Sequence, residues 1–279
     1  MAQLIDGKQI SKEIKDELKT EVQKLKSEGK NVCLAVVHVG DDPASTVYVN
    51  NKKKACAYIG IESRSYELPE STSEEELTAL VEELNEDDEV NGILVQLPLP
   101  SHIDEDRIIR TISPDKDVDG FHPVSVGRLW IGEKGFLSCT PAGIIQLLKR
   151  SNIEIAGKNC VIIGRSNIVG KPMAALLLRE NGTVTITHSK TKDLQKITKT
   201  ADILIVAIGK ERFITSDYVK EGAVVIDVGM HRDSENHLCG DVDFKDVEPK
   251  VSAITPVPGG VGPMTIAMLM NNCVETARC

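Results

Sequence analysis

Hydrophobic positions fall into helical stripes and short aliphatic runs that alternate along the chain. Ile10, Ile14 and Leu18 recur at helical spacing and predict a helix that ends near Gly29. The run at 32–39 is aliphatic at nearly every position, which is typical of a strand buried on both faces. The chain is therefore expected to begin with a helix that leads into a buried strand.

The same alternation continues to the last residues. Further helices are expected at 45–59, around Ile108 and at 265–276. Another is expected to start at a capping box formed by Ser73 and Glu76 and to run to Leu84. A further helix is expected to start at a cap at Thr140, with Pro141 as its first helical residue. Further strands are expected at 63–68, 92–97, 160–163, 184–187, 203–207, 224–228 and 252–254. Strands that alternate with helices predict an α/β fold with parallel sheets, because parallel strands need crossover connections. The stretch 113–123 is rich in turn residues.

Composition and charge narrow the class of protein. Hydrophobic residues make up 41% of the 279 residues but aromatic residues only 3%, so the core must be aliphatic. A net charge of −9 argues against nucleic acid as a partner, because phosphate binding needs a basic face. The seven cysteines form no CxxC pair, and no apolar run approaches the roughly 18 residues of a membrane span. Without a signal peptide, the chain is expected to be cytoplasmic and not bound to a membrane.

A glycine turn after the strand at 160–163 indicates a dinucleotide site. Gly164 follows the strand, Ser166 occupies the position of the second glycine in GxGxxG, and Gly170 lies six residues after Gly164. Pro172 is well placed to open the following helix, whose N-terminus suits a pyrophosphate. A plain strand–turn–helix with no ligand stays an alternative at this point.

The next strand favours NADP over NAD. A Rossmann unit that binds NAD usually has Asp or Glu about 20 residues on, at the end of this strand, to hold the ribose 2′-hydroxyl. Here the strand ends in Thr187, His188, Ser189 and Lys190, with no carboxylate. Arg165, Ser189 and Lys190 could instead bind a 2′-phosphate.

Three residues in the first part of the chain are candidates for catalysis. Tyr48 and Lys52 are four residues apart on one helix and share a face, although a solvated basic run is the alternative for 52–54. Gln96 ends a strand, where ligands bind in parallel sheets, although a turn amide is the alternative. No metal site is expected. The run 115–120 resembles half of an EF-hand loop but Val126 stands where a Glu is required, and His231, His237 and Cys239 lack zinc spacing and are expected in a loop.

Taken together, these motifs resemble the bifunctional methylenetetrahydrofolate dehydrogenase/methenyltetrahydrofolate cyclohydrolase family. The matching stretches are 48–56, 95–100, 116–121, 164–170 and 258–265. The resemblance implies a catalytic αβα domain at 1–138, a Rossmann domain for NADP at 139–263, a cleft between them, and a last helix at 264–279 that packs back on the first domain. It also implies oxidation of 5,10-methylenetetrahydrofolate with NADP+, hydrolysis of the product to 10-formyltetrahydrofolate, and a homodimer.

The resemblance assigns roles to residues of this chain. Lys52 would be the catalytic lysine, Tyr48 its neighbour over the folate, Gln96 the amide that orients the lysine, and Asp119 the partner of the pterin. Leu97, Pro258, Gly259 and Gly260 would contact the tetrahydrofolate substrate. Residues implied to contact NADP are Gly164, Arg165, Ser166, Ile168, Val169, Ser189 and Met230.

Three other functions are weighed against this one. A dehydrogenase without the hydrolase step, or one that uses NAD, would share most motifs. A non-catalytic NADP sensor need not retain Tyr48, Lys52, Gln96 and Asp119 together, so their joint presence speaks against it. A shikimate-dehydrogenase-like enzyme would share the two-domain plan, but its substrate motifs are not found.

Overall fold

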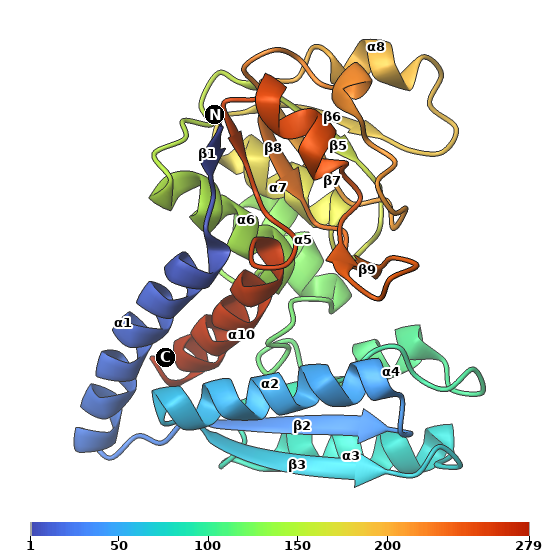
Figure 1. Cartoon of the computed structure of the whole chain (residues 1–279). Helices are drawn as coiled ribbons and strands as arrows, with labels where there is room; N and C mark the ends of the chain where they lie inside the picture. Colours follow the sequence, from blue (N-terminus) through green and yellow to red (C-terminus); the bar gives the residue numbers. More distant parts are fainter. Residues whose placement is uncertain (1, 279) are drawn as a thin grey trace. The chain divides into compact units, whose positions relative to one another are not determined.

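The computed structural model describes residues 2–278, which divide into two compact units (Figure 1). One unit contains residues 12–137 and 266–278, and the other contains residues 2–11 and 138–265. Each unit is built on a parallel sheet, so the predicted two-domain α/β fold is confirmed. Among residues 2–278, no helix combines the length and the apolar character that crossing a bilayer requires.

The first unit has a sheet in the order β3-β2-β4. Its strands are β2 (Cys33–Val39), β3 (Glu62–Leu68) and β4 (Gly92–Val95). Its helices are α2 (Pro43–Ile59), α3 (Glu74–Glu86), α4 (Glu105–Thr111), α5 (Pro123–Ile131), and most of α1 (Gly7–Ser27) and of α10 (Val261–Ala277). The helices α2 and α3 lie on opposite faces of the sheet (Figure 1).

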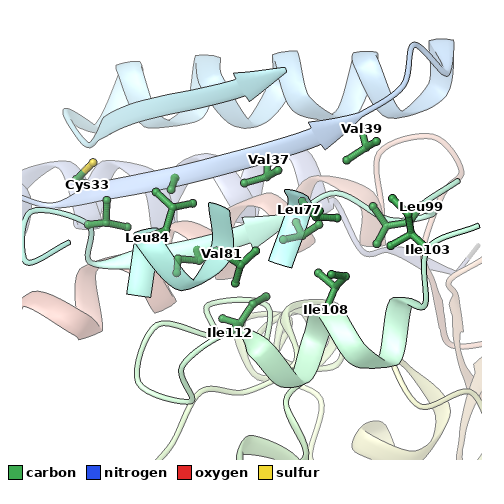
Figure 2. Packing of buried hydrophobic residues seen from close by; sticks show 14 residues of the cluster. Cys33, Val37, Val39, Leu77, Val81, Leu84, Leu99, Ile103, Ile108 and Ile112 are labelled. Atoms are coloured by element: carbon green, nitrogen blue, oxygen red, sulfur yellow. The ribbon is translucent and has the colours of Figure 1, made fainter. Parts of the chain in front are cut away.

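Alternate residues of β2 face a hydrophobic cluster under the sheet. Cys33, Ala35, Val37 and Val39 point to the side where α3 and α4 supply Leu77, Val81, Leu84, Ile108 and Ile112 (Figure 2). The predicted capping box starts α3, since the Glu76 amide donates to Ser73 Oγ and the Ser73 amide to the Glu76 carboxylate. This packing fixes β2 and β4, and with them the position of their carboxyl ends.

The second unit has a parallel sheet in the order β1-β11-β8-β7-β5-β6. Its strands are β1 (Gln3–Leu4), β5 (Asn159–Ile163), β6 (Thr183–Thr187), β7 (Ile203–Val206), β8 (Val224–Asp227) and β11 (Ala253–Ile254), with the pair β9 (His231–Arg232) and β10 (Leu238–Cys239) beside it. The helices are α6 (Cys139–Arg150), α7 (Gly170–Arg179), α8 (Leu194–Thr198) and α9 (Phe244–Val247). Two 3-10 turns, η1 (Ser216–Tyr218) and η2 (Glu248–Lys250), connect strands.

Several elements differ from the sequence prediction. Residues 2–11, expected in the first domain, belong to the second unit because β1 pairs with β11, a contact between sequence-distant residues. The helix α5 and the pair β9–β10 were not predicted, and the expectation of a loop at His231 and Cys239 was wrong, since these two residues pair across antiparallel strands.

Two helix starts also lie earlier than predicted. Ser138, not Thr140, is at the cap position of α6, and its hydroxyl donates to the Ile168 carbonyl oxygen. The helix α7 begins at Gly170, so Pro172 lies inside its first turn. Thr140, Pro141 and Pro172 correctly predicted that a helix starts nearby. The exact first residue of α6 depends on a longer-range contact, the hydrogen bond from Ser138 to Ile168.

Candidate active site

Lys52 and Gln96 meet at the carboxyl edge of the first unit's sheet. Asp42 caps the start of α2, because its side chain accepts a hydrogen bond from the Ser45 amide, and this helix carries Lys52. Gln96 follows β4, and its backbone N–H donates to the Val37 carbonyl oxygen, which keeps Gln96 in line with the strand. Lys52 Nζ donates to Gln96 Oε1 at 3.0 Å, and Lys52 is only 8% exposed.

A second side-chain hydrogen bond of Gln96 fixes the orientation of its side-chain amide. Gln96 Nε2 donates to the Leu97 carbonyl oxygen at 2.6 Å. Because a lysine amine at this position donates and a carbonyl oxygen accepts, only the orientation with Oε1 toward Lys52 satisfies both contacts. Gln96 therefore holds the amine at a defined place instead of allowing it to reach into solvent.

The three consecutive lysines of α2 have different environments. Lys53 Nζ lies 2.8 Å from Glu67 Oε1 in an ion pair with β3, and Lys54 is exposed. Tyr48 lies one turn before Lys52 and is half-buried, and burial raises the pKa of its phenol, so the hydroxyl keeps its proton. The buried lysine of the run is thus the one that shares a helical face with Tyr48.

The loop that carries Asp119 is organised by a buried carboxylate, Asp117. Asp117 is 2% exposed and accepts hydrogen bonds from Ser125 Oγ at 2.7 Å and from the amides of Phe121 and His122 at 3.2 and 2.8 Å. Burial raises the pKa of Asp117 to about 6. Asp119 itself is half-buried.

Asp119 and Leu97 line the same small pocket of the first unit. Its walls also include Ile93, Ile108 and Phe121. On the other side of the loop, Asn272 Nδ2 donates to the Val118 carbonyl oxygen at 2.8 Å, so α10 holds the backbone next to Asp119. The polar edge of this pocket can therefore present a carboxylate to a ligand beside an apolar wall.

The second unit has a glycine turn with no room for side chains. Gly164 follows β5 with φ +125°, and a Cβ there would lie 2.1 Å from the Ala207 carbonyl oxygen. A Cβ on Gly170 would lie 2.3 Å from the Gly164 carbonyl oxygen. The strand end, the turn and the N-terminus of α7 are therefore packed backbone to backbone, which is the geometry that admits a dinucleotide phosphate.

Polar side chains surround this turn on the exposed side. Arg165 and Ser166 follow Gly164, and Ser189 lies two residues beyond β6, the neighbour of β5 in the sheet; all three are exposed. Ser166 Oγ accepts the amides of Val169 and Gly170 at 3.2 and 3.3 Å, so it caps the start of α7. The chemistry of these residues fits NADP, since a cation follows the end of β5 and a hydroxyl follows the end of the neighbouring β6.

The remaining predicted contacts lie in the same turn and at other loops of the second unit. Ile168 is exposed and Val169 half-buried on the way into α7, and Met230 is 46% exposed after β8. Pro258 is exposed, whereas Gly259 and Gly260 are buried. A Cβ on Gly260 would lie 2.6 Å from the Pro256 carbonyl oxygen, which accounts for glycine at this position.

Two family models match this chain. Residues 5–119 match the catalytic domain of the tetrahydrofolate dehydrogenase/cyclohydrolase family, and residues 138–279 match its NAD(P)-binding domain. The chain belongs to this family. The family resemblance inferred from the sequence motifs is confirmed, and with it the two activities, dehydrogenase and cyclohydrolase.

Full-length relatives agree with this assignment. The chain is 74% identical to the bifunctional protein FolD of Lachnoclostridium phytofermentans, with 100% of this chain and 99% of that protein covered. The crystal structure of FolD from Campylobacter jejuni is 54% identical and superposes with a TM-score of 0.98 over 100% of this chain and 99% of that one. The Trypanosoma brucei enzyme, solved with NADP and an inhibitor, is 39% identical with a TM-score of 0.94 over 99% and 97%.

Some residues that shape the site of this family member were missed in the sequence. The sequence placed Asp117 in the unsuitable calcium loop and in the family stretch 116–121 without giving it a role of its own, and it gave no role to Asn272 in the last helix. A polar residue inside an otherwise apolar stripe is the signal that could have pointed to Asn272, because a buried amide needs partners. Its partners, the Val118 and Leu137 carbonyl oxygens, are more than 100 residues away in sequence.

Proposed function

We propose that this chain oxidises 5,10-methylenetetrahydrofolate to 5,10-methenyltetrahydrofolate with NADP+ and hydrolyses the product to 10-formyltetrahydrofolate. The observation that best supports the hydrolytic step is the buried Lys52 amine held by Gln96. The methenyl carbon is part of a delocalised cation, so water can add to it without a metal. As general base, the Lys52 amine accepts the proton that the attacking water loses.

Other residues have supporting roles in this proposal. Gln96 keeps the amine in place, and Tyr48, with its proton retained, contacts the folate from the same helical face. Asp119 binds the donor edge of the pterin, with Leu97 as an apolar wall. Pro258, Gly259 and Gly260 are proposed as further folate contacts.

The turn after β5 is proposed to bind NADP. When bound, NADP+ supplies the hydride acceptor. Gly164 leaves the turn clear, and the side chains of Arg165 and Ser189 receive the 2′-phosphate. The other contacts proposed for the cofactor are Ser166, Ile168, Val169 and Met230.

Cellular location and assembly are part of the same proposal. The enzyme is proposed to be cytoplasmic and homodimeric, as its resemblance to the family implies. Analytical ultracentrifugation of the purified chain tests the assembly: a sedimenting mass twice that of the chain supports a dimer, and the mass of one chain contradicts it.

An absorbance assay that follows NADPH and methenyltetrahydrofolate together tests the reaction. The wild type is expected to produce NADPH from methylenetetrahydrofolate and NADP+, and to consume added methenyltetrahydrofolate. Lys52→Met should lower the hydrolytic rate by at least about 100-fold, the typical contribution of a general base, while folate still binds. Lys54→Met, on an exposed side chain of the same helix, is the matched control and should hydrolyse at the wild-type rate. Hydrolysis at the wild-type rate by Lys52→Met would refute the role of Lys52.

A further inference from the structure

A fully buried carboxylate, Asp241, gathers the loop that follows β7. Asp241 is 0% exposed, and its side chain accepts hydrogen bonds from three consecutive backbone amides. These donors are Ile208, Gly209 and Lys210, at 2.8, 3.1 and 2.8 Å. Three N–H groups aimed at one carboxylate force the loop into a concave shape around it.

The same carboxylate also holds the segment that follows β8. His231 Nε2 lies 2.8 Å from Asp241 Oδ1 and donates to it, and His231 is the residue next to Met230. Asp241 thus ties together two loops that begin on neighbouring strands, because β7 pairs directly with β8.

A second carboxylate, Asp227 at the end of β8, supports the first. It accepts the amides of Gly229, Asp241 and Val242, each at 3.0 Å. A Cβ on Gly240 would lie 1.9 Å from Asp227 Oδ2, and a Cβ on Gly229 would lie 2.4 Å from Asp241 Oδ1. Both glycines are required because the carboxylates fill the space that side chains would need.

These loops lie at the edge of the sheet proposed to bind the cofactor. The loop after β7 begins at Ala207, whose carbonyl oxygen closely approaches Gly164, and the segment after β8 carries Met230. In open parallel sheets, ligands bind beyond the carboxyl ends of the strands. The shape of the two loops therefore determines part of the surface available to a dinucleotide.

We propose that Asp241 and His231 are positioning residues for the cofactor: together they hold the loops after β7 and β8 in the arrangement that binds NADP(H). This inference rests on the proposed NADP site and extends it to residues that need not touch the cofactor. Asp241 provides the charge that collects the loop amides, and His231 connects that charge to the segment of Met230. A preformed site binds more tightly because its loops need not be ordered during binding.

Titration of the full-length protein with NADPH, followed by the fluorescence of the cofactor, tests this inference. His231→Ala is expected to raise the dissociation constant at least about 10-fold, the lower end of the effect of losing a hydrogen bond to a charged group. His231→Gln, whose amide can still donate to Asp241, should restore it to within about 3-fold of the wild type. Hydrolysis of added methenyltetrahydrofolate, which needs no cofactor, should keep its Michaelis constant in both variants.

His237→Ala is the matched control, in the turn between the same two short strands. His237 is exposed and faces the carboxylates of Asp233 and Glu235, and its removal should leave NADPH binding unchanged. Asp241→Asn should weaken NADPH binding more than His231→Ala does. If the Asp241→Asn protein fails to fold, the His231 variants still test the inference.

The outcomes separate this inference from the proposed function. Wild-type affinity for NADPH in His231→Ala overturns the inference alone. An equal loss of NADPH affinity in His231→Ala and His231→Gln also overturns it, because the hydrogen bond would not be the cause. The same holds if the Michaelis constant for methenyltetrahydrofolate rises as much as the dissociation constant for NADPH. A wild type that binds no NADPH contradicts the proposed cofactor and the inference with it.

Discussion

The three consecutive lysines of α2 differ in their contacts because they differ in burial. Lys52 is buried against Gln96, Lys53 pairs with Glu67, and Lys54 is exposed. The four-residue spacing from Tyr48 singled out Lys52 in the sequence, since residues four apart share a helical face. The partner Gln96, 44 residues later, was expected at a strand end, but the hydrogen bond to Lys52 followed from the packing of α2 on the sheet.

Replacement of Arg165 tests the predicted preference for NADP+ over NAD+. Arg165→Ala should raise the Michaelis constant for NADP+ about 10-fold, because a charge-assisted contact to the 2′-phosphate is lost, and should leave the constant for NAD+ nearly unchanged. Steady-state dehydrogenase rates with each cofactor provide the measurement. Arg179→Ala, an exposed arginine at the end of α7, is the control and should change neither constant. Equal effects on NADP+ and NAD+ in Arg165→Ala would remove the case for 2′-phosphate recognition.

The glycine turn between β5 and α7 depends on close backbone contacts. Gly164 lies against the Ala207 carbonyl oxygen, and Gly170 against Gly164 itself. The sequence showed both glycines, although their spacing departs from the usual pattern. The close approach of Ala207, the residue after β7, explains why the first glycine cannot be replaced, since β7 lies beside β5 in the sheet.

Gly164→Ala should destabilise the protein and weaken the binding of NADPH. A methyl group 2.1 Å from a carbonyl oxygen, at φ +125°, requires the strands to move apart, and should lower the free energy of unfolding by at least about 2 kcal/mol. Urea denaturation and a NADPH titration measure the two effects. Gly127→Ala is the contrasting variant: it lies inside α5 with open space around it, and should raise the free energy of unfolding by about 0.5–1 kcal/mol. A Gly164→Ala protein as stable as the wild type would contradict the packing of this turn.

At the scale of the whole molecule, each compact unit combines segments that are far apart in the sequence. Residues 2–11 supply β1 to the sheet of the second unit, and residues 266–278 complete the first unit. Asn272 shows the consequence, because it holds the backbone carbonyl oxygens of Val118 and Leu137. The loop of Asp119 is therefore stabilised by the last helix of the chain.

The stability of the whole molecule should depend on pH through Asp117. Burial raises its pKa from 3.8 to about 6, so the folded state binds more protons than the unfolded state between these values. The contribution of Asp117 to stability is therefore greatest below about pH 4 and is lost as the pH rises from about 4 to about 6, by up to about 3 kcal/mol.

Urea denaturation between pH 4 and pH 7 tests this dependence in the wild type and in Asp117→Asn. The difference in the free energy of unfolding between the two proteins should shift in favour of the variant as the pH rises. Asp115→Asn, on an exposed side chain of the same loop, should follow the wild type throughout. A constant difference between wild type and Asp117→Asn over this range would contradict the prediction.

The sequence by itself determined the α/β class, most helices and strands, the glycine turn and the family, because these depend on periodicity and on residues close together in the chain. It did not reveal β1, the pair β9–β10, the cap at Ser138, or the carboxylates Asp117 and Asp241 as organisers of loops. A short strand is stable only beside its partner, and a buried carboxylate is stable only where distant amides and hydroxyls converge on it. Tertiary structure alone decides where those partners meet.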